Sequence, residues 1–220
     1  MLKLCYNKIT PIFSLVDEFY PKGVLNMYNK IITISREFGS GGRTIGRRVA
    51  EQLGIPCYDK EIVEQVAIES GFVKEYIEEK GEYLSASGKM STLFTLHHLY
   101  SNMNNEDIIW AAQVKVIKEL AEKGPCVIIG RCADYILRDR ADVVKVFIYS
   151  DMDSRATRIV RLYGDQTDTP EKRLKDKDKK RAAYYKHFTE MEWGDPKHYD
   201  LCINSGYFGT DRCVEIIKNL

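Results

Sequence analysis

Short apolar runs alternate along this chain with longer stretches of helical periodicity. Four runs have the length and the β-branched composition of buried strands, and they span residues 31–34, 126–129, 143–149 and 201–204. A shorter extended segment is expected at 55–59, where a proline disfavours α geometry in the residue before it. Apolar strands separated by helices indicate an α/β fold with a mostly parallel sheet and right-handed crossovers.

Three stretches between these runs are predicted to be helices. From Ile45 onward, apolar residues recur every four positions, and Gly54 ends the pattern. Residues 61–81 look helical and highly charged, and residues 106–123 form an amphipathic pattern that ends at a Gly-Pro pair. Residues 82–105 are ambiguous and favour a loop with one short helix.

A glycine-rich turn, GSGG, joins the first strand to the first helix. In a strand–loop–helix arrangement, backbone N–H groups and the helix N-terminus converge on a phosphate, and glycines let the backbone approach the ligand closely. At the helix start, the cation of Arg43 can meet phosphate oxygens and the hydroxyl of Thr44 can reach Mg²⁺. We therefore predict a phosphate-binding loop that consists of Gly39, Ser40, Gly41, Gly42, Arg43 and Thr44.

The turn departs from the usual pattern, G-x-x-x-x-G-K-[ST]. In one alignment Glu37 replaces the first glycine and Arg43 replaces the lysine. In a shifted alignment Gly41 is the last loop glycine and Gly42 stands where the lysine should be. A glycine-rich turn without a ligand stays open as an alternative, and so does a dinucleotide-binding fingerprint, which would lack its third glycine at Thr44.

Two polar residues stand at the carboxyl ends of predicted strands, the edge at which open α/β sheets bind ligands. Arg131 follows the run 126–129 and is well placed to grip an anionic substrate, although it can also be a solvated loop arginine. Asp59 ends the segment 55–59, and its alternative role is the N-cap of a helix that begins near Lys60.

The segment 154–186 is the most polarised part of the chain, with 11 Lys and Arg against 5 Asp and Glu. Within it, arginines recur every three residues and should line one helical face, at positions Arg155, Arg158 and Arg161. Such a run can be a solvated face or a nucleic-acid contact. Beside a phosphate loop it also fits a closing lid, which brings cations to a transferring phosphoryl group.

The composition narrows the function classes. The formal net charge is +1 over 220 residues, which argues against wholesale binding of nucleic acid. Six cysteines without a C-x-x-C pair are read as small buried hydrophobes in a reducing compartment, so we expect a cytoplasmic protein. No apolar run approaches the roughly 20 residues of a membrane span, so no membrane contact is expected.

Two stretches carry little signal of their own. Residues 1–29 have no secretory apolar region, and Met27 is a candidate translation start, so we expect an extension outside the core. His97 and His98 lack acidic or cysteine partners at helical spacing and are read as ordinary histidines rather than metal ligands.

Several motifs together resemble the cytidylate kinase-like family of the nucleoside monophosphate kinase group. They are SREFGSGGRT, PCYD, IIGR, SRATRIVR, DKKR and YDLCINS, and they run from about residue 31 to the C-terminus. The resemblance implies a three-layer P-loop kinase fold, with a parallel sheet flanked by helices and an arginine-rich helical lid. It also implies one kinase domain over 30–220, an acceptor-binding insert at about 60–105 and a lid at about 152–190.

The resemblance also implies roles for individual residues. The loop would bind ATP with Mg²⁺ on Thr44, Arg43 would do the work of the lysine, and Arg155 and Arg158 would neutralise the transferring phosphoryl group. The residues carried over to the acceptor nucleotide are Asp59, Arg131, Asp178 and Arg181. The implied partners are nucleotide substrates, and the implied reaction is phosphoryl transfer to a nucleoside monophosphate, with CMP or dCMP first.

This chain departs from the family pattern in the acceptor site as well as in the loop. Cys132 stands where an aspartate is usual, and Lys60-Glu61 replaces a Ser/Thr-Gly pair. The identity of the acceptor is therefore open. Two alternatives are a P-loop kinase of another small acceptor and a nucleotide-binding sensor that does not catalyse.

Overall fold

Five parallel strands form one sheet in the order β2-β3-β1-β4-β5. The computed structural model describes residues 30–220 except 73, 75–77, 79–104 and 165. The strands are β1 (Ile31–Arg36), β2 (Cys57–Tyr58), β3 (Cys126–Ile129), β4 (Val143–Tyr149) and β5 (Leu201–Asn204). All five were predicted, and β1 runs two residues further than expected because Ser35 and Arg36 pair with Phe147 and Ile148 of β4.

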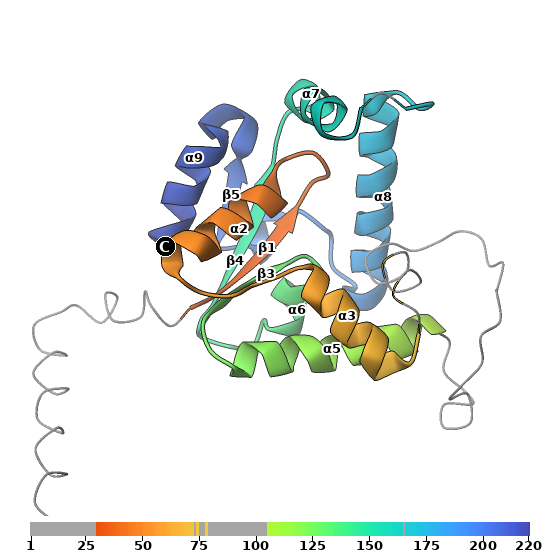
Figure 1. Ribbon diagram of the computed structural model, residues 1–220, viewed down its shortest axis with the longest axis vertical. Helices are drawn as coiled ribbons and strands as arrows, with labels where there is room; N and C mark the ends of the chain where they lie inside the picture. The colour runs from red at the N-terminus through yellow and green to blue at the C-terminus, as the bar shows by residue number, and fades with distance from the viewer. Residues whose placement is uncertain (1–29, 73, 75–77, 79–104, 165) are drawn as a thin grey trace, which may run out of the picture.

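Helices cover both faces of the sheet and give the three layers visible in Figure 1. Successive residues of β1 face opposite layers, so Ile31 packs on one side while Ile32 and Ile34 pack on the other. The helices on the Ile31 side are α3 (Lys60–Ser70), α5 (Asn105–Glu122) and α6 (Ala133–Ile136). Those on the opposite side are α2 (Gly42–Leu53) and α9 (Ser205–Lys218). The predicted α/β class with a parallel sheet is confirmed.

The helix boundaries agree with the sequence at two of the three predicted helices. Gly54 takes a left-handed conformation (φ 66°) and ends α2, and α5 lies within one residue of its predicted range at each end. The helix predicted from residue 61 is confirmed as far as Ser70, where Gly71 (φ 73°) ends α3, and most of residues 73–81 lies outside the described part of the chain. Residues 1–29 and 82–104, with His97 and His98, lie outside the described part of the chain.

Between β4 and β5 the chain forms two helices, α7 (Met152–Tyr163) and α8 (Pro170–Thr189), and a short 3-10 turn, η2 (Pro196–His198). Side-chain caps start both helices: Asp151 accepts a hydrogen bond from the Ser154 N–H (2.8 Å), and Thr169 accepts one from the Lys172 N–H (3.3 Å). The β1–α2 loop points toward α7 and α8 in Figure 1. The charged segment therefore borders the loop.

The cysteines fit the sequence prediction in part. Cys126, Cys132 and Cys213 are buried, Cys57 and Cys202 are half-buried, and all five are free thiols. Burial raises the pKa of the Cys126 thiol to about 12, which makes it inert. Among the described residues, no helix combines the length and apolar character needed to cross a bilayer.

Candidate active site

The β1–α2 loop has the backbone of a phosphate cradle. Gly39 and Gly41 take positive φ angles of 81° and 82°, and α2 begins at Gly42. A Cβ on Gly39 would lie 3.0 Å from side-chain atoms of both Ile159 and Leu174, so this position has no room for a side chain. The first N–H groups of an α-helix have no acceptor within the helix, so those at the start of α2 are candidate ligands of an anion.

Hydrogen bonds from distant elements hold this loop in place. Ser205, the first residue of α9, donates its hydroxyl to the Ser40 carbonyl oxygen (2.6 Å). Asp178 of α8 accepts the Phe38 N–H (2.7 Å). Within the loop, the Ser40 hydroxyl donates to the Glu37 carbonyl oxygen (2.9 Å). The cradle is thus fixed by α8 and α9 as well as by its own glycines.

Two arginines of α7 reach the loop. Arg155 is buried, and its Nη1 donates to Asp178 Oδ2 (2.5 Å) and to the Phe38 carbonyl oxygen (3.3 Å). Arg158 donates from Nη2 to the Thr44 hydroxyl (3.0 Å). Arg161 is exposed, so the three-residue spacing brings two of the three predicted arginines to the loop.

Glu37 completes the ion-pair network around Arg155. Its Oε2 lies 3.4 Å from Arg155 Nε and accepts the Ser150 N–H (3.0 Å). Burial raises the pKa of Glu37 above its ordinary value, and the Ser150 hydrogen bond and the Arg155 charge oppose that effect. Two acidic groups, Glu37 and Asp178, therefore hold one buried arginine against the loop.

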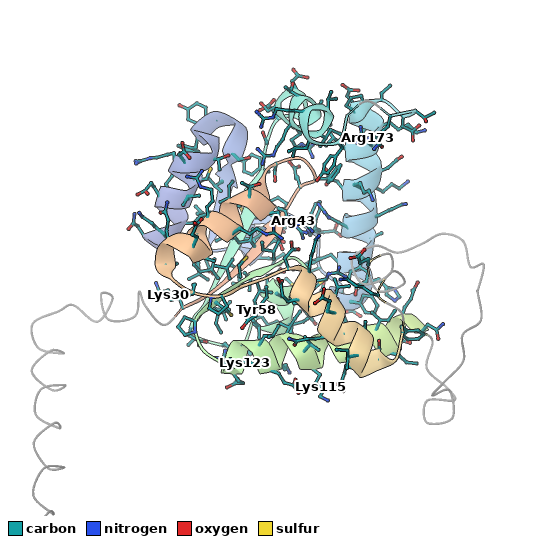
Figure 2. All side chains as sticks on the ribbon, in the orientation of Figure 1. Lys30, Arg43, Tyr58, Lys115, Lys123 and Arg173 are labelled. Atoms are coloured by element: carbon teal, nitrogen blue, oxygen red, sulfur yellow. The ribbon has the colours of Figure 1, made fainter. Side chains whose placement is uncertain are left out.

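Arg43, at the start of α2 (Figure 2), pairs with Asp59, the residue directly before α3. Its Nε lies 2.7 Å from Asp59 Oδ2 and its Nη2 donates to Oδ1 (3.1 Å), a bidentate pair. Arg47 adds a contact of 3.3 Å to the same carboxylate. Asp59 does occupy the N-cap position of α3, as the alternative predicted, but its side chain makes no capping hydrogen bond there and pairs with the two arginines instead.

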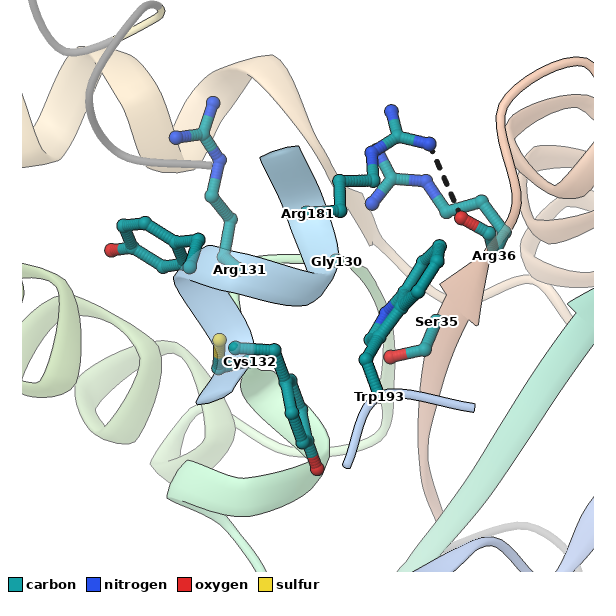
Figure 3. A pocket seen from close by; sticks show the side chains of 9 residues that line it. Ser35, Arg36, Gly130, Arg131, Cys132, Arg181 and Trp193 are labelled. Atoms are coloured by element: carbon teal, nitrogen blue, oxygen red, sulfur yellow. Dashed lines mark hydrogen bonds between the residues drawn. The ribbon is translucent and has the colours of Figure 1, made fainter. Parts of the chain in front are cut away.

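A pocket opens beside the loop at the carboxyl ends of β1 and β3 (Figure 3). Its charged walls come from Arg36, Arg131 and Arg181, which we call the pocket arginines. The Arg181 Nη1 donates to the Arg36 carbonyl oxygen (3.2 Å), and all three residues are buried. The remaining lining is polar or aromatic and consists of Ser35, Gly130, Cys132, Tyr184, Tyr185 and Trp193.

Backbone strain shapes one wall of this pocket. Arg131 and Cys132 both take left-handed conformations, with φ angles of 60° and 54°. Non-glycine residues rarely adopt this region, and such outliers gather at binding sites. The amide of Gln113 donates to the Arg131 carbonyl oxygen (2.9 Å) and holds the turn in place. The fold therefore presents Arg131 at the strand end, where the sequence predicted it.

Asp134 lies beside this pocket and is nearly inaccessible to solvent. Its two carboxylate oxygens accept hydrogen bonds from the Ser35 hydroxyl (3.2 Å) and the Tyr185 hydroxyl (2.7 Å). Burial raises the pKa of Asp134, and the two hydrogen bonds only partly oppose that effect. Asp134 thus joins Ser35 of β1 to Tyr185 of α8, and both of these residues line the pocket.

Sequence reasoning missed three features of this site: Arg36, Glu37 and the aromatic wall. The sequence prediction gave Arg36 no role, although an arginine at the end of an apolar strand is the same signal that identified Arg131, and the structure buries it. Tyr184 and Tyr185 sit in a charged helix where nothing in the local pattern marks them as inward-facing. Asp178 is found against the loop and Arg155, and Arg181 in the pocket.

Comparisons with known proteins assign the chain to a family. Residues 31–207 match the model of the cytidylate kinase-like family. The cytidylate kinase of Archaeoglobus fulgidus is 30% identical over 190 residues, which cover 84% of this chain and 91% of that protein. The cytidylate kinase of Methanopyrus kandleri is 24% identical over 197 residues, covering 86% of this chain and 91% of that protein.

Solved structures extend the likeness to the fold. An uncharacterised protein from Eubacterium ventriosum superposes with a TM-score of 0.65 at 30% identity, covering 86% of this chain and 96% of that chain. A shikimate kinase from Bacteroides thetaiotaomicron superposes with a TM-score of 0.51 at 15% identity, with the same two coverages. The second likeness shows a shared kinase fold, and its acceptor says nothing about this chain.

Proposed function

Because the chain belongs to the cytidylate kinase-like family, we propose that it transfers the γ-phosphoryl group of ATP to a nucleoside monophosphate, with CMP or dCMP as the first candidates. One observation carries the proposal: the phosphate loop, the α7 arginines and the pocket arginines converge at one edge of the sheet. Phosphoryl transfer needs little covalent chemistry from the protein, and it depends on positioning and on cations around the transferring group.

On the donor side, the loop from Gly39 to Thr44 would hold the ATP phosphates through its N–H groups. The Thr44 hydroxyl, in the first turn of α2, would be the protein ligand of Mg²⁺. Among the described residues no group of three His, Cys, Asp or Glu side chains could hold a metal ion, so ATP itself would supply most of the ligands. Bound Mg²⁺ would neutralise phosphate charge.

The helices α7 and α8 would act as the lid. Arg158, which contacts Thr44, would neutralise charge on the transferring phosphoryl group, and Arg155 would hold the lid to the loop through Asp178 and Phe38. Both Asp178 oxygens are engaged there, so its contact with the acceptor sugar stays a prediction. The lysine-like role of Arg43 also stays a prediction.

On the acceptor side, Arg131 and Arg181 would bind the phosphate of the nucleoside monophosphate in the pocket. Guanidinium groups suit this work because their planar fork matches two phosphate oxygens. Asp59, paired with Arg43, would border the acceptor beside α3. Because the tyrosines and Trp193 line the same pocket, a flat nucleobase or another apolar group can pack there.

A coupled phosphoryl-transfer assay over CMP, dCMP, UMP, AMP and small hydroxylated acceptors tests this proposal. We expect magnesium-dependent transfer to at least one nucleoside monophosphate, and an increase in the KM for that acceptor of about tenfold or more in Arg131→Ala, since hydrogen bonds to charged groups contribute about 1.5–3 kcal/mol. Arg138→Ala is the matched control, because this arginine is exposed, follows α6 outside the pocket lining and contacts Tyr135. Tight ATP binding without transfer to any acceptor would favour the nucleotide sensor.

A further inference from the structure

We propose that Arg36 supplies the positive charge that P-loop kinases usually take from the loop lysine, and that Gly42 provides the space for it. The inference rests on the proposed phosphoryl transfer. It assigns a phosphate-binding cation to β1, outside the glycine loop. Positions 36 and 42 would thus have exchanged roles relative to the usual loop. The cation stands at the strand end, as Arg36, instead of at the helix start, and the small residue stands at the helix start, as Gly42.

The first support is steric. A Cβ placed on Gly42 would lie 2.5 Å from the Cβ and 2.9 Å from the Cγ of Arg36. The Arg36 Cβ is fixed by the strand backbone, so it cannot move aside as the end of a flexible side chain could. A lysine at position 42 is therefore incompatible with an arginine at position 36. The Arg36 side chain starts from the space where such a lysine would start.

The second support is the place of the Arg36 side chain. Arg36 is the last residue of β1, pairs with Ile148 of β4 and is buried. Its side chain runs from the end of β1 into the pocket beside Arg181, as Figure 3 shows. The backbone of Arg36 thus borders the cradle proposed for the donor, and its side chain lines the pocket proposed for the acceptor. A transferring phosphoryl group must pass between those two places.

The third support is what the neighbouring cations do. Arg43, the lysine substitute in the other alignment, faces Asp59 in a bidentate pair and is about half exposed. Arg158 reaches Thr44 from α7, so its position depends on α7 resting against the loop. Arg36 is instead anchored on the central strand of the sheet. Its guanidinium can contact two phosphate oxygens at once, which a lysine ammonium does less well.

A reciprocal exchange of the two residues tests the inference. We expect Arg36→Gly to lower kcat by about 10²-fold or more, the usual loss when a preorganised charge at the transferring group is removed. Gly42→Lys alone should also be impaired, because its side chain meets Arg36. The double variant, Arg36→Gly with Gly42→Lys, should recover much of kcat, since the lysine then has both the space and the charge.

The controls separate charge from folding. Arg36→Met keeps the apolar stem and removes the charge, and Arg36→Lys keeps a charge and should retain more activity than Arg36→Met. Thermal unfolding of each variant shows whether it is folded. The affinity for Mg·ATP, measured by calorimetry, gives a readout independent of the acceptor: it should fall in Arg36→Met and recover in the double variant.

Three outcomes would overturn the inference. The first is a folded Arg36→Met with wild-type kcat and wild-type Mg·ATP affinity. The second is a folded double variant no better than either single variant. The third is a rise in the acceptor KM alone, which would assign Arg36 to the acceptor. Failure of the proposed function looks different, because the wild type would then bind Mg·ATP without transferring phosphate. The role of Arg36 would still be tested by the Mg·ATP affinities of Arg36→Met and of the double variant.

Discussion

The arginines on the sheet and the arginines on α7 are held in different ways. Arg36 ends β1 and Arg131 follows β3, so strand pairing and buried backbone hydrogen bonds fix their positions. Arg155 and Arg158 come from a helix that meets the loop through Asp178, Phe38 and Thr44. The first pair is part of the folded core, whereas the second pair is in place when α7 rests on the loop.

The same contrast divides α8 into two halves. Its first half carries Asp178, which accepts the Phe38 N–H from the loop. Its second half packs Phe188 against Trp110 of α5, with stacked rings 4.6 Å apart, and Tyr184 joins the same aromatic cluster. The first half of α8 is therefore attached to the loop by Asp178 together with the buried Leu174, whereas the second half is attached to α5 by aromatic packing.

The largest expected effect tests the ion pairs of α7. Arg155→Ala should lower the rate of phosphoryl transfer by about 10²- to 10³-fold, because the lid loses its buried charge and its contact with Phe38. Steady-state kinetics measure the loss. Arg161→Ala on the same helix is the control, since that arginine is exposed and should leave the rate within about twofold, as surface substitutions do. Equal losses of rate in both variants would show that the burial of Arg155 and its contact with Phe38 do not matter for the reaction.

A second prediction asks whether charge alone holds α7 and α8 to the loop. Leu174 is fully buried and would touch a Cβ on Gly39. We expect Leu174→Ala to lower the free energy of unfolding by about 2–4 kcal/mol, the range for buried leucines. Urea unfolding measures this, with Leu162→Ala on exposed α7 surface as the control. A cost below about 1 kcal/mol would show that the apolar contact contributes little to the attachment of the lid.

Comparing one loop glycine with the glycine that ends α2 tests how tightly α7 and α8 pack on the loop, and the expected effect is smaller. Gly39 and Gly54 both have left-handed backbones, but neighbours crowd Gly39 and nothing lies within 4 Å of a Cβ on Gly54. Gly54→Ala should cost about 1 kcal/mol from the backbone alone, and Gly39→Ala should cost about 1–3 kcal/mol more because of overpacking against Ile159 and Leu174. Thermal unfolding compares the two. Equal losses of stability in the two variants would mean that α7 and α8 shift to accommodate the added methyl group at position 39 without destabilising the fold.

The last prediction concerns pH and the sheet side of the site. Burial raises the pKa of Asp134 above its ordinary 3.8, so this group stabilises the fold at low pH and its contribution is lost as pH rises through the raised pKa. Asp134→Asn should remove this pH-dependent loss. The difference in the free energy of unfolding between the wild type and the variant should therefore shrink as pH increases. Urea unfolding at several pH values measures it. Glu37 shifts in the same direction, so the difference between the two proteins isolates Asp134.

Much of the fold could be predicted from the sequence because its strands are continuous apolar runs and its helices have one periodic face. The order of the strands could not, since nothing in residues 31–34 identifies β3 and β4 as neighbours. The loop was found because its glycines are adjacent in sequence. Arg36 was missed because its importance depends on Gly42, and the contact between them exists only in the fold. The Arg43–Asp59 pair was missed for the same reason.

The central position of β1 has a consequence for how the molecule forms. Ile31 pairs with Cys126 on one side and with Val143 on the other, so its nearest strand partner lies 95 residues downstream. Contacts this distant in sequence pay a large loop-closure entropy and form slowly. During synthesis the glycine loop would leave the ribosome long before the strands that shape it. A nascent chain that has reached the end of α5 thus contains every residue of the cradle but none of the residues of β3, β4, α8 and α9 that support it.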